Sequence, residues 1–200
     1  MKLRIISGEL KGRYIIVPDA VGFRPTLERT RESVAEILKK RLRDGPAAAD
    51  LCAGSGSFGF EMLSRGARRV DFVEQDKAAA ARISENAKRI CVEERISVVQ
   101  SDVRGFAAGK SGAYDLIFYD PPYADSSLAE FTPKLLSLLR EDGVLVYERQ
   151  RRAGEKKNVF ADNKPSMFDA RIFADTVVEF HRRERLAVAA ANIITTKESN

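Results

Sequence analysis

The chain has 200 residues, of which 44% are hydrophobic and 32% are charged, and this composition is typical of a single globular domain with a sizeable core. It contains two cysteines and one histidine, its longest apolar runs fall far short of the roughly 20 residues of a membrane span, and charge interrupts its start too early for a signal peptide. We therefore expect no disulfide framework, no zinc site, no membrane segment and a cytoplasmic location.

The net charge of +5 is concentrated in the first 46 residues. This segment holds 11 Lys or Arg against 6 Asp or Glu, whereas residues 47–200 hold 23 of each kind. A basic excess confined to one segment is typical of a nucleic-acid contact, although a solvated face can have the same composition.

Two elements are predicted within this basic segment. The β-branched runs at 3–6 and 14–17 flank a glycine-containing turn, which predicts a hairpin. Apolar residues then recur at helical spacing, which predicts a helix over about 27–43.

Three arginines, Arg24, Arg29 and Arg31, gather near the start of that helix. Cations are unfavourable at a helix N-terminus, so a negative partner should offset the cost. An RNA phosphate or an internal carboxylate such as Glu32 could do so, and we favour the RNA contact.

A glycine-rich loop follows the next predicted strand. Residues 47–53 are predicted to be a strand, followed by Gly54-Ser55-Gly56-Ser57-Phe58-Gly59 and a helix over 60–64. The glycines permit a tight turn and a close approach of a ligand to the helix N-terminus. This pattern suits a nucleotide-type cofactor, but it is weak evidence by itself.

Acidic residues end the strands that come next. Strand 70–74 ends at Glu74, about 20 residues after Gly54, where a ribose-binding acid belongs. A helix over 77–91 leads to strand 96–100, after which Asp102 could accept an adenine amino group, cap the helix predicted at 103–107, or do both. Strands that alternate with helices indicate a parallel, doubly wound sheet.

A rigid tetrapeptide, Asp120-Pro121-Pro122-Tyr123, follows the strand predicted at 114–119. Prolines fix their own φ and restrict the preceding residue, so this segment can hold a carboxylate, a carbonyl and a ring in one arrangement. Asp120 and the Pro121 carbonyl can accept hydrogen bonds from an exocyclic amine of a nucleobase, on which Tyr123 can stack. A proline-rich turn that merely ends a strand is the simpler interpretation.

The remaining residues complete the sheet. We predict a helix over 126–139, a strand over 143–148, an exposed basic loop from 149 to 158, and a closing hairpin at 168–173 and 176–181, with His181 structural. The predicted fold is α/β: a Rossmann-like, doubly wound, mostly parallel seven-stranded sheet with helices on both faces. We divide the chain into a basic hairpin and helix (1–46), a core (47–185) and a tail (186–200).

With these residues identified, the chain resembles the class I S-adenosylmethionine-dependent methyltransferases that act on exocyclic amines. The likeness narrows to the RsmD family of bacterial 16S ribosomal RNA guanine-N2 methyltransferases. It rests on three motifs within residues 1–150: Arg24-Pro25-Thr26, Asp50-Leu51-Cys52-Ala53-Gly54-Ser55-Gly56, and Leu63-Ser64-Arg65-Gly66-Ala67.

The resemblance implies roles for the residues described above. Transfer of a methyl group to the N2 amine of a guanine would use Asp120, Pro121, Pro122 and Tyr123, and RNA would contact Arg24, Arg29 and Arg31. The substrate would be 16S ribosomal RNA within the small ribosomal subunit, and we expect a monomer. The S-adenosylmethionine contacts would be Asp50, Ala53, Gly54, Ser55, Gly56, Glu74, Gln75, Asp102 and Val103.

The chain departs from the family pattern at three places. Ala35-Glu36 replaces Phe-Asn, Tyr123 replaces a phenylalanine that would stack equally well, and Ala174 replaces the glycine of a Tyr-Gly-Asp-Thr turn. If that turn requires a positive φ, alanine fits it poorly.

Three other functions compete with this one. An adenine-N6 methyltransferase of DNA or RNA could use the same tetrapeptide, and an NAD-dependent oxidoreductase could use the same glycine loop. A catalytically silent ribosome-binding module would leave the acids at the strand ends without a role.

Overall fold

The computed structural model describes residues 1–17, 31–32, 34–36, 38, 45–108, 111–122, 131–152, 155 and 166–183. Several predictions therefore fall on residues outside these ranges. They concern Arg24, Arg29, Tyr123, most of the helix expected at 27–43, the start of the helix expected at 126–139, and the tail from 186.

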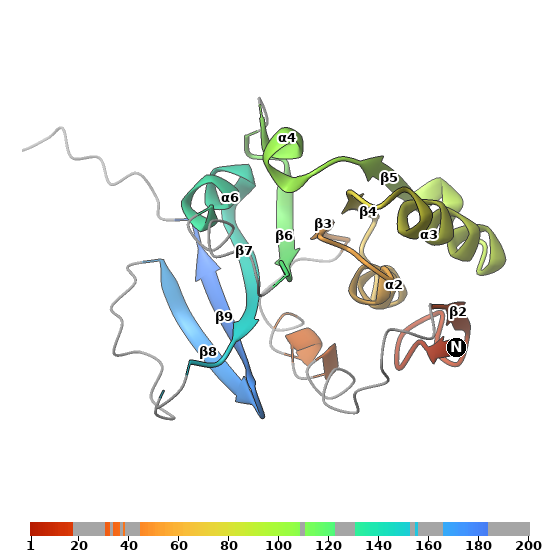
Figure 1. Cartoon of the computed structure of the whole chain (residues 1–200), viewed down its shortest axis with the longest axis horizontal. Helices are drawn as coiled ribbons and strands as arrows, with labels where there is room; N and C mark the ends of the chain where they lie inside the picture. Colours follow the sequence, from red (N-terminus) through yellow and green to blue (C-terminus); the bar gives the residue numbers. More distant parts are fainter. Residues whose placement is uncertain are drawn as a thin grey trace, which may run out of the picture.

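Strands and helices alternate through the centre of the chain, as the sequence predicts (Figure 1). The strands are β1 (Lys2–Arg4), β2 (Tyr14–Ile16), β3 (Ala47–Leu51), β4 (Arg69–Glu74), β5 (Ile96–Gln100), β6 (Tyr114–Tyr119), β7 (Leu139–Gln150), β8 (Met167–Phe173) and β9 (Thr176–Arg182). The helices are α2 (Ser57–Ser64), α3 (Lys77–Arg89), α4 (Val103–Ala107) and α6 (Thr132–Leu138), with a 3-10 turn at Glu93–Arg95. Among these helices, none combines the length and the hydropathy that a membrane crossing requires.

The main sheet has seven strands in the order β5-β4-β3-β6-β7-β9-β8. Five strands are parallel to one another, namely β3, β4, β5, β6 and β7. Strand β9 runs antiparallel to both β7 and β8. The order changes direction at β3, because β4 and β6 flank it on opposite sides. The prediction of a doubly wound, mostly parallel seven-stranded sheet is confirmed.

Apolar side chains on the two faces of the sheet form two separate cores. Alternate residues of a strand point to opposite faces, so Phe118 packs on one side and Tyr119 on the other. The first core includes side chains of α2 and α3, and the second includes side chains of α4 and α6. Helices therefore cover both faces, as expected.

The N-terminal hairpin forms as predicted, and it packs onto the first core. Strands β1 and β2 pair antiparallel, and the buried Ile5, Leu10 and Ile15 belong to the same apolar cluster as α2 and α3. The division of the chain at residue 46 stays a prediction, but the hairpin shares its hydrophobic core with the sheet domain.

Buried polar side chains attach the hairpin to the two helices beneath it. Glu61 of α2, which is fully buried, accepts the backbone N–H groups of Ile6 (3.0 Å) and Ser7 (3.2 Å). Asn86 of α3 pairs with both backbone groups of Ile16, at 2.8 Å each. The approach is so close that a Cβ atom on Gly8 would lie 1.8 Å from the backbone oxygen of Ser64.

Several boundaries differ from the sequence prediction by one or more residues, and two of these differences have an identifiable cause. Helix α2 begins at Ser57 rather than at residue 60, because Gly56 takes a left-handed conformation (φ 73°) and acts as the N-cap. Strand β7 extends over Leu139–Gln150 rather than 143–148, because pairing with β6 begins at Leu139 and pairing with β9 continues to Gln150.

The turn between β8 and β9 does place Ala174 at a positive φ of 51°. The two strands nevertheless pair from Phe173↔Thr176 up to Met167↔His181. The hairpin therefore forms with alanine in a conformation that favours glycine, at an energetic cost.

Candidate active site

The acidic residues at the strand ends come together at the carboxyl edge of the sheet. Leu51, the last residue of β3, pairs with Val73 of β4 and with Tyr119 of β6. Glu74 and Asp120 therefore follow at the same level on either side of the loop that leaves β3. The sequence prediction that one edge gathers these groups is confirmed by the register.

The glycine-rich loop turns sharply directly after β3. Cys52 (φ 58°), Gly54 (φ 52°) and Gly56 (φ 73°) all adopt left-handed conformations, and the Gly56 N–H donates to the Ala53 carbonyl at 2.7 Å. Among the residues that the structure describes, a Cβ atom on Gly54 would meet no atom nearer than the Cys52 oxygen at 4.0 Å, so these residues leave this surface of the loop open to a ligand. Nothing in the sequence indicates that Cys52 also adopts the left-handed conformation.

Glu74 connects the loop to β4. Its two carboxylate oxygens accept the backbone N–H of Gly54 (2.7 Å) and of Asp76 (2.9 Å). An ionised carboxylate has about four lone-pair positions, so it retains acceptor capacity for the hydroxyl groups of a ribose. Gln75, the residue after Glu74, is exposed beside it.

Asp50 lies underneath the loop rather than on its open side. Its side chain is 2% exposed and accepts the Gly59 N–H at 2.9 Å, which holds the start of α2 against β3. Burial raises the pKa of Asp50 to about 8; the Gly59 N–H opposes this rise, and the nearby negative charges of Asp120 and Glu74 contribute to it. Asp50 thus supports the loop from within.

Asp120 lies at the end of β6, next to this loop. Its N–H points to the Leu51 carbonyl at 3.5 Å, and burial raises its pKa to about 6. Pro121 is buried and Pro122 is exposed, so the backbone turns outward directly after Asp120. Tyr123 lies outside the described residues.

An aromatic contact fixes the loop relative to Asp120. The rings of Phe58 (α2) and Phe118 (β6) stack with their centroids 3.7 Å apart. Phe58 belongs to the first turn of α2, and Phe118 stands two residues before Asp120. The stack therefore holds the cofactor loop and the candidate catalytic carboxylate in one rigid arrangement.

Asp102 caps α4, which is one of the two roles considered for it. Its Oδ1 accepts the Gly105 N–H at 2.6 Å, while the residue as a whole stays exposed. Val103, which follows it, is buried. Contact of Asp102 with an adenine amino group stays a prediction.

Arg31 is placed differently from what an RNA contact requires. Arg31 is 7% exposed, and Val34 and Ala35, three and four residues further along the chain, are buried as well. This burial favours an internal partner over an RNA phosphate, and contact of Arg31 with RNA stays a prediction. His181 is 1% exposed and bonded to Glu179, which confirms its structural role.

The sequence did not single out Tyr147 as a residue of this region. Its ring stacks on Tyr119 with the centroids 5.5 Å apart. Burial raises the pKa of Tyr147, and the negative charges of Glu179 and Asp120 contribute to this direction. An aromatic residue late in a buried strand gives no signal in the sequence that distinguishes it from ordinary core.

Three features define the fold of a class I S-adenosylmethionine-dependent methyltransferase. They are the strand order, the glycine loop at the carboxyl edge of the sheet, and the acid Glu74 at the end of the next strand. The family model described as "Conserved hypothetical protein 95" matches residues 3–180. Ribosomal RNA small subunit methyltransferase D of Escherichia coli K12 is 34% identical over 147 residues, which cover 74% of this chain and 71% of the relative. The chain belongs to this family, the RsmD family.

Two further comparisons agree with this assignment. The putative rRNA methyltransferase YlbH of Bacillus subtilis 168 is 32% identical over 154 residues, which cover 74% of this chain and 83% of the relative. The solved structure of the putative methyltransferase yhhF from Escherichia coli superimposes with a TM-score of 0.77 at 28% identity, covering 92% of this chain and 99% of that structure.

The described residues fit S-adenosylmethionine, the cofactor of this class. The open surface at Gly54 leaves room for the cofactor above the loop. Glu74 has spare acceptor capacity for the ribose hydroxyl groups, and the partly exposed Asp120 adds a negative charge beside the loop. A positively charged sulfonium suits such a cluster of carboxylates.

Proposed function

We propose that this chain methylates the exocyclic N2 amine of a guanine in 16S ribosomal RNA of the small ribosomal subunit. The observation that carries the proposal is the position of Asp120, which lies beside the open cofactor loop and is followed by two prolines. Membership of the RsmD family supports the same reaction. A ribosomal RNA substrate would also agree with the expected cytoplasmic location and with a monomer.

Residues of the loop and of β4 would hold the cofactor. Gly54 to Gly56 would lie under its methionine end, Glu74 would accept from its ribose, and Asp102 and Val103 would flank its adenine. When bound, S-adenosylmethionine supplies a methyl group on a positively charged sulfur.

Asp120 would orient the guanine amine. Its carboxylate and the Pro121 carbonyl can each accept one N–H, which directs the nitrogen lone pair towards the methyl group and favours the pyramidal form that attacks. The nitrogen gains a methyl group and loses one proton, which Asp120 can receive directly or through water. Its pKa of about 6 is close to neutral, so the carboxylate is mostly ionised at pH 7.5 and still able to take a proton.

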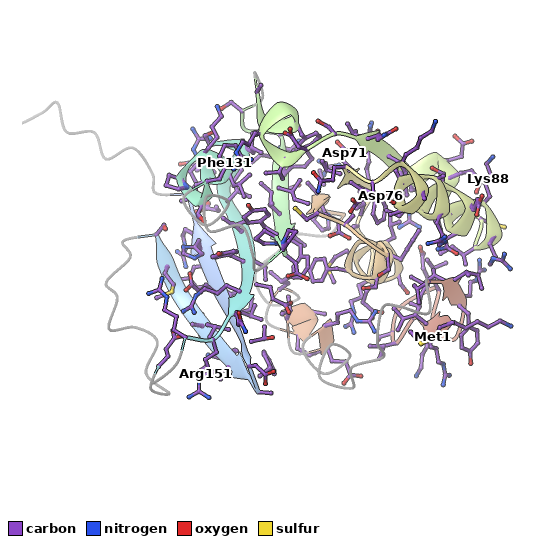
Figure 2. All side chains as sticks on the ribbon, viewed as in Figure 1. Met1, Asp71, Asp76, Lys88, Phe131 and Arg151 are labelled. Atoms are coloured by element: carbon purple, nitrogen blue, oxygen red, sulfur yellow. The ribbon has the colours of Figure 1, made fainter. Side chains whose placement is uncertain are left out.

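The outer surface of the N-terminal hairpin offers a contact for the RNA. Lys2, Arg4 and Tyr14 are exposed, and Arg4 pairs with Tyr14 across β1 and β2, which places these two side chains on one face. Tyr14 is 48% exposed, which is unusual for a large aromatic side chain. Lys88 lies at the same end of the molecule as Met1 (Figure 2). Cations beside an exposed ring suit a phosphate backbone and a stacked base.

The test is transfer of radiolabelled methyl groups by the wild type and by Asp120→Asn. The acceptors are small ribosomal subunits and 16S ribosomal RNA from cells that lack the enzyme, together with DNA, and the products are digested to nucleosides. We expect label in N2-methylguanosine with the wild type and a loss of at least 100-fold in Asp120→Asn, because this variant replaces the charged carboxylate by a neutral amide, which is a weaker acceptor for the amine and cannot take its proton.

One control and two alternative outcomes make the experiment decisive. Calorimetry should show that Asp120→Asn still binds S-adenosylmethionine, so that the loss can be assigned to chemistry. Label in N6-methyladenine would replace the guanine proposal by the adenine alternative. No label in any acceptor, with no cofactor binding by the wild type, would reject a methyltransferase and leave a binding module.

A further inference from the structure

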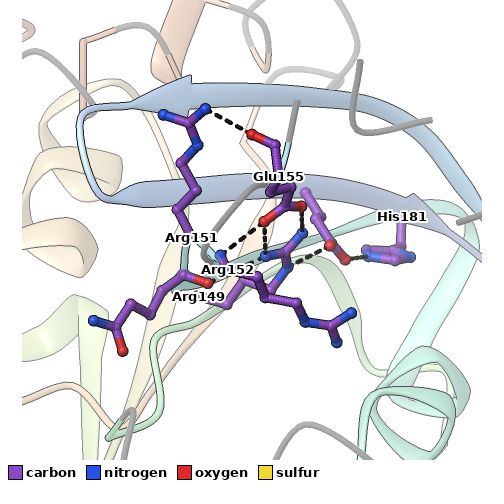
Figure 3. A network of polar contacts seen from close by, with 7 residues as sticks. Arg149, Arg151, Arg152, Glu155 and His181 are labelled. Atoms are coloured by element: carbon purple, nitrogen blue, oxygen red, sulfur yellow. Dashed lines mark hydrogen bonds and ion pairs between the residues drawn. The ribbon is translucent and has the colours of Figure 1, made fainter. Parts of the chain in front are cut away.

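A buried arginine at the end of β7 is held by a fixed partner on the neighbouring strand. The Arg149 Nε donates to Glu179 of β9 at 2.7 Å, and both side chains are buried. The other oxygen of Glu179 lies 3.0 Å from His181 Nε2 (Figure 3). His181 Nδ1 lies 3.0 Å from the Ser166 hydroxyl. Arg149, Glu179 and His181 all lie on strands, so the orientation of the guanidinium is fixed by the sheet.

The outer edge of the same guanidinium holds a carboxylate that does not come from the sheet. Arg149 donates to both oxygens of Glu155, through Nη2 at 2.5 Å and Nη1 at 3.0 Å (Figure 3). The Arg152 N–H donates to the second of these oxygens at 2.9 Å. The Arg151 side chain donates to the Glu155 backbone oxygen at 2.7 Å. The hydrogen bonds from Arg149 and from the Arg152 N–H, together with the charges of these two residues, lower the pKa of Glu155 to about 2.

The donors around Glu155 are those that bind a phosphate group. A guanidinium fork matches carboxylate and phosphate oxygens equally well, and a backbone N–H is a common further donor to phosphate. Three arginines within four residues bring enough positive charge for an anion from another molecule. Glu155 stands five residues after the end of β7, outside any strand, so it can leave while Arg149 stays paired with Glu179.

The donors around Glu155 are close to the candidate active site. Strand β7 runs parallel to β6, and Tyr147 pairs with Tyr119, the last residue of β6. Arg149 therefore lies two residues beyond the level of Tyr119, and Asp120 lies one residue beyond it. The charges of Glu179, Arg149, Arg152 and Asp120 all influence the pKa of Tyr147, so these groups lie within electrostatic range of one hydroxyl. A nucleotide held at Asp120 would thus have neighbouring phosphates within reach of this edge.

We propose that the Glu155 carboxylate occupies a phosphate-binding site formed by the Arg149 guanidinium and the Arg152 N–H, with Arg151 beside it, and that a phosphate of the RNA substrate replaces the carboxylate on binding. The proposal rests on the proposed RNA substrate. A phosphodiester carries one negative charge, as the carboxylate does, so the exchange leaves the charge at the site unchanged. Glu155 thereby keeps the buried guanidinium paired when no RNA is bound. It also competes with free anions, whereas a phosphate of an RNA that is already bound elsewhere on the enzyme has a higher effective concentration at the site.

The expected effect follows from the fraction of molecules in which the site is available. If Glu155 occupies it in about nine-tenths of the free molecules, its removal tightens RNA binding by up to about tenfold. Glu155→Gln keeps the size of the side chain and removes its charge. Glu85→Gln, on the exposed surface of α3, makes the same change of net charge and is the matched control.

The experiment measures binding of unmethylated 16S ribosomal RNA to the full-length protein by filter retention at fixed salt. We expect Glu155→Gln to bind about three- to tenfold more tightly than the wild type and Glu85→Gln to bind equally. Arg149→Lys, which keeps the charge beside Glu179 but lacks the fork, should bind more weakly. In the Arg149→Lys background, Glu155→Gln should give no gain, because the two residues form one site.

Each other outcome has a definite meaning. If Glu155→Gln binds RNA no more tightly, while the wild type methylates RNA normally, this inference alone is overturned and Glu155 is a structural clamp. If inorganic phosphate alone raises the melting temperature of Glu155→Gln and RNA affinity is unchanged, the site takes a free anion and the inference is also overturned. If the wild type neither binds nor methylates RNA, both this inference and the proposed function are rejected.

Discussion

Replacement of Asp50 by asparagine should stabilise the chain at neutral pH. Burial raises the pKa of Asp50 to about 8 in the folded chain, compared with 3.8 as its ordinary value. Between these values the folded chain holds a proton that the unfolded chain has lost. Stabilisation by that proton is complete below about pH 4 and is lost as the pH rises through about 8.

The size of the effect follows from this window. At pH 7, which is 3.2 pH units above the ordinary pKa of 3.8, ionisation of Asp50 lowers the free energy of the unfolded chain but not that of the folded chain. At 1.36 kcal/mol per pH unit, this destabilises the folded chain by about 4 kcal/mol. Asparagine has no such loss, and its oxygen can still accept the Gly59 N–H. Its buried NH2 group needs an acceptor and costs about 1–3 kcal/mol without one. The net gain at pH 7 is therefore roughly 1–3 kcal/mol.

Urea denaturation of the wild type and of Asp50→Asn from pH 4 to pH 8, without cofactor, measures this effect. The difference in unfolding free energy should shift by about 4 kcal/mol in favour of the variant between pH 4 and pH 7. Asp76→Asn is the matched control, because Asp76 is an exposed N-cap at which asparagine serves equally well. Parallel curves for the wild type and Asp50→Asn across this range would refute the reasoning.

Three further substitutions test the backbone and the buried contacts. Ala174→Gly should raise the unfolding free energy by about 0.5–1 kcal/mol, because φ is 51° there, and an unchanged urea midpoint would contradict this. Gly59→Ala would place a Cβ 2.3 Å from Phe72 Cε1, so we expect a loss of about 1–3 kcal/mol and weaker S-adenosylmethionine binding by calorimetry. Glu61→Gln should cost about 2 kcal/mol and speed amide hydrogen exchange in residues 5–10 but not in β8 and β9; uniform acceleration would contradict a local contact.

The main sheet could be predicted because its signals are local. Runs such as 114–119 are apolar and short, and each is followed by a turn or a helix start, so element type and order can be read from neighbouring residues. The acids at the strand ends were also predictable, because parallel strands present their carboxyl ends at one edge. The exact start of α2 was not, since it depends on the left-handed conformation of Gly56.

The contacts that the sequence could not show are long-range and polar. Glu61 and Asn86 have the appearance of solvated helix residues, and only the hairpin some 50 to 80 residues earlier buries them. Arg149 belongs to a basic run that we interpreted as an exposed loop, yet it is buried between Glu179 and Glu155. Charge patterns give the composition of a segment but not the partner that covers it.

One continuous set of contacts connects the proposed RNA-binding surface with the cofactor loop. The hairpin is bonded to Glu61 of α2, and the start of the same helix is bonded through Gly59 to Asp50 beneath the loop. Helix α2 has only eight residues and is almost entirely buried, so a displacement at one end of the helix also displaces the other end. The basic hairpin is for this reason better understood as a packed part of the sheet domain than as an appended RNA-binding arm. It follows that a variant such as Glu61→Gln should impair cofactor binding as well as RNA binding, whereas a purely appended arm would affect RNA alone.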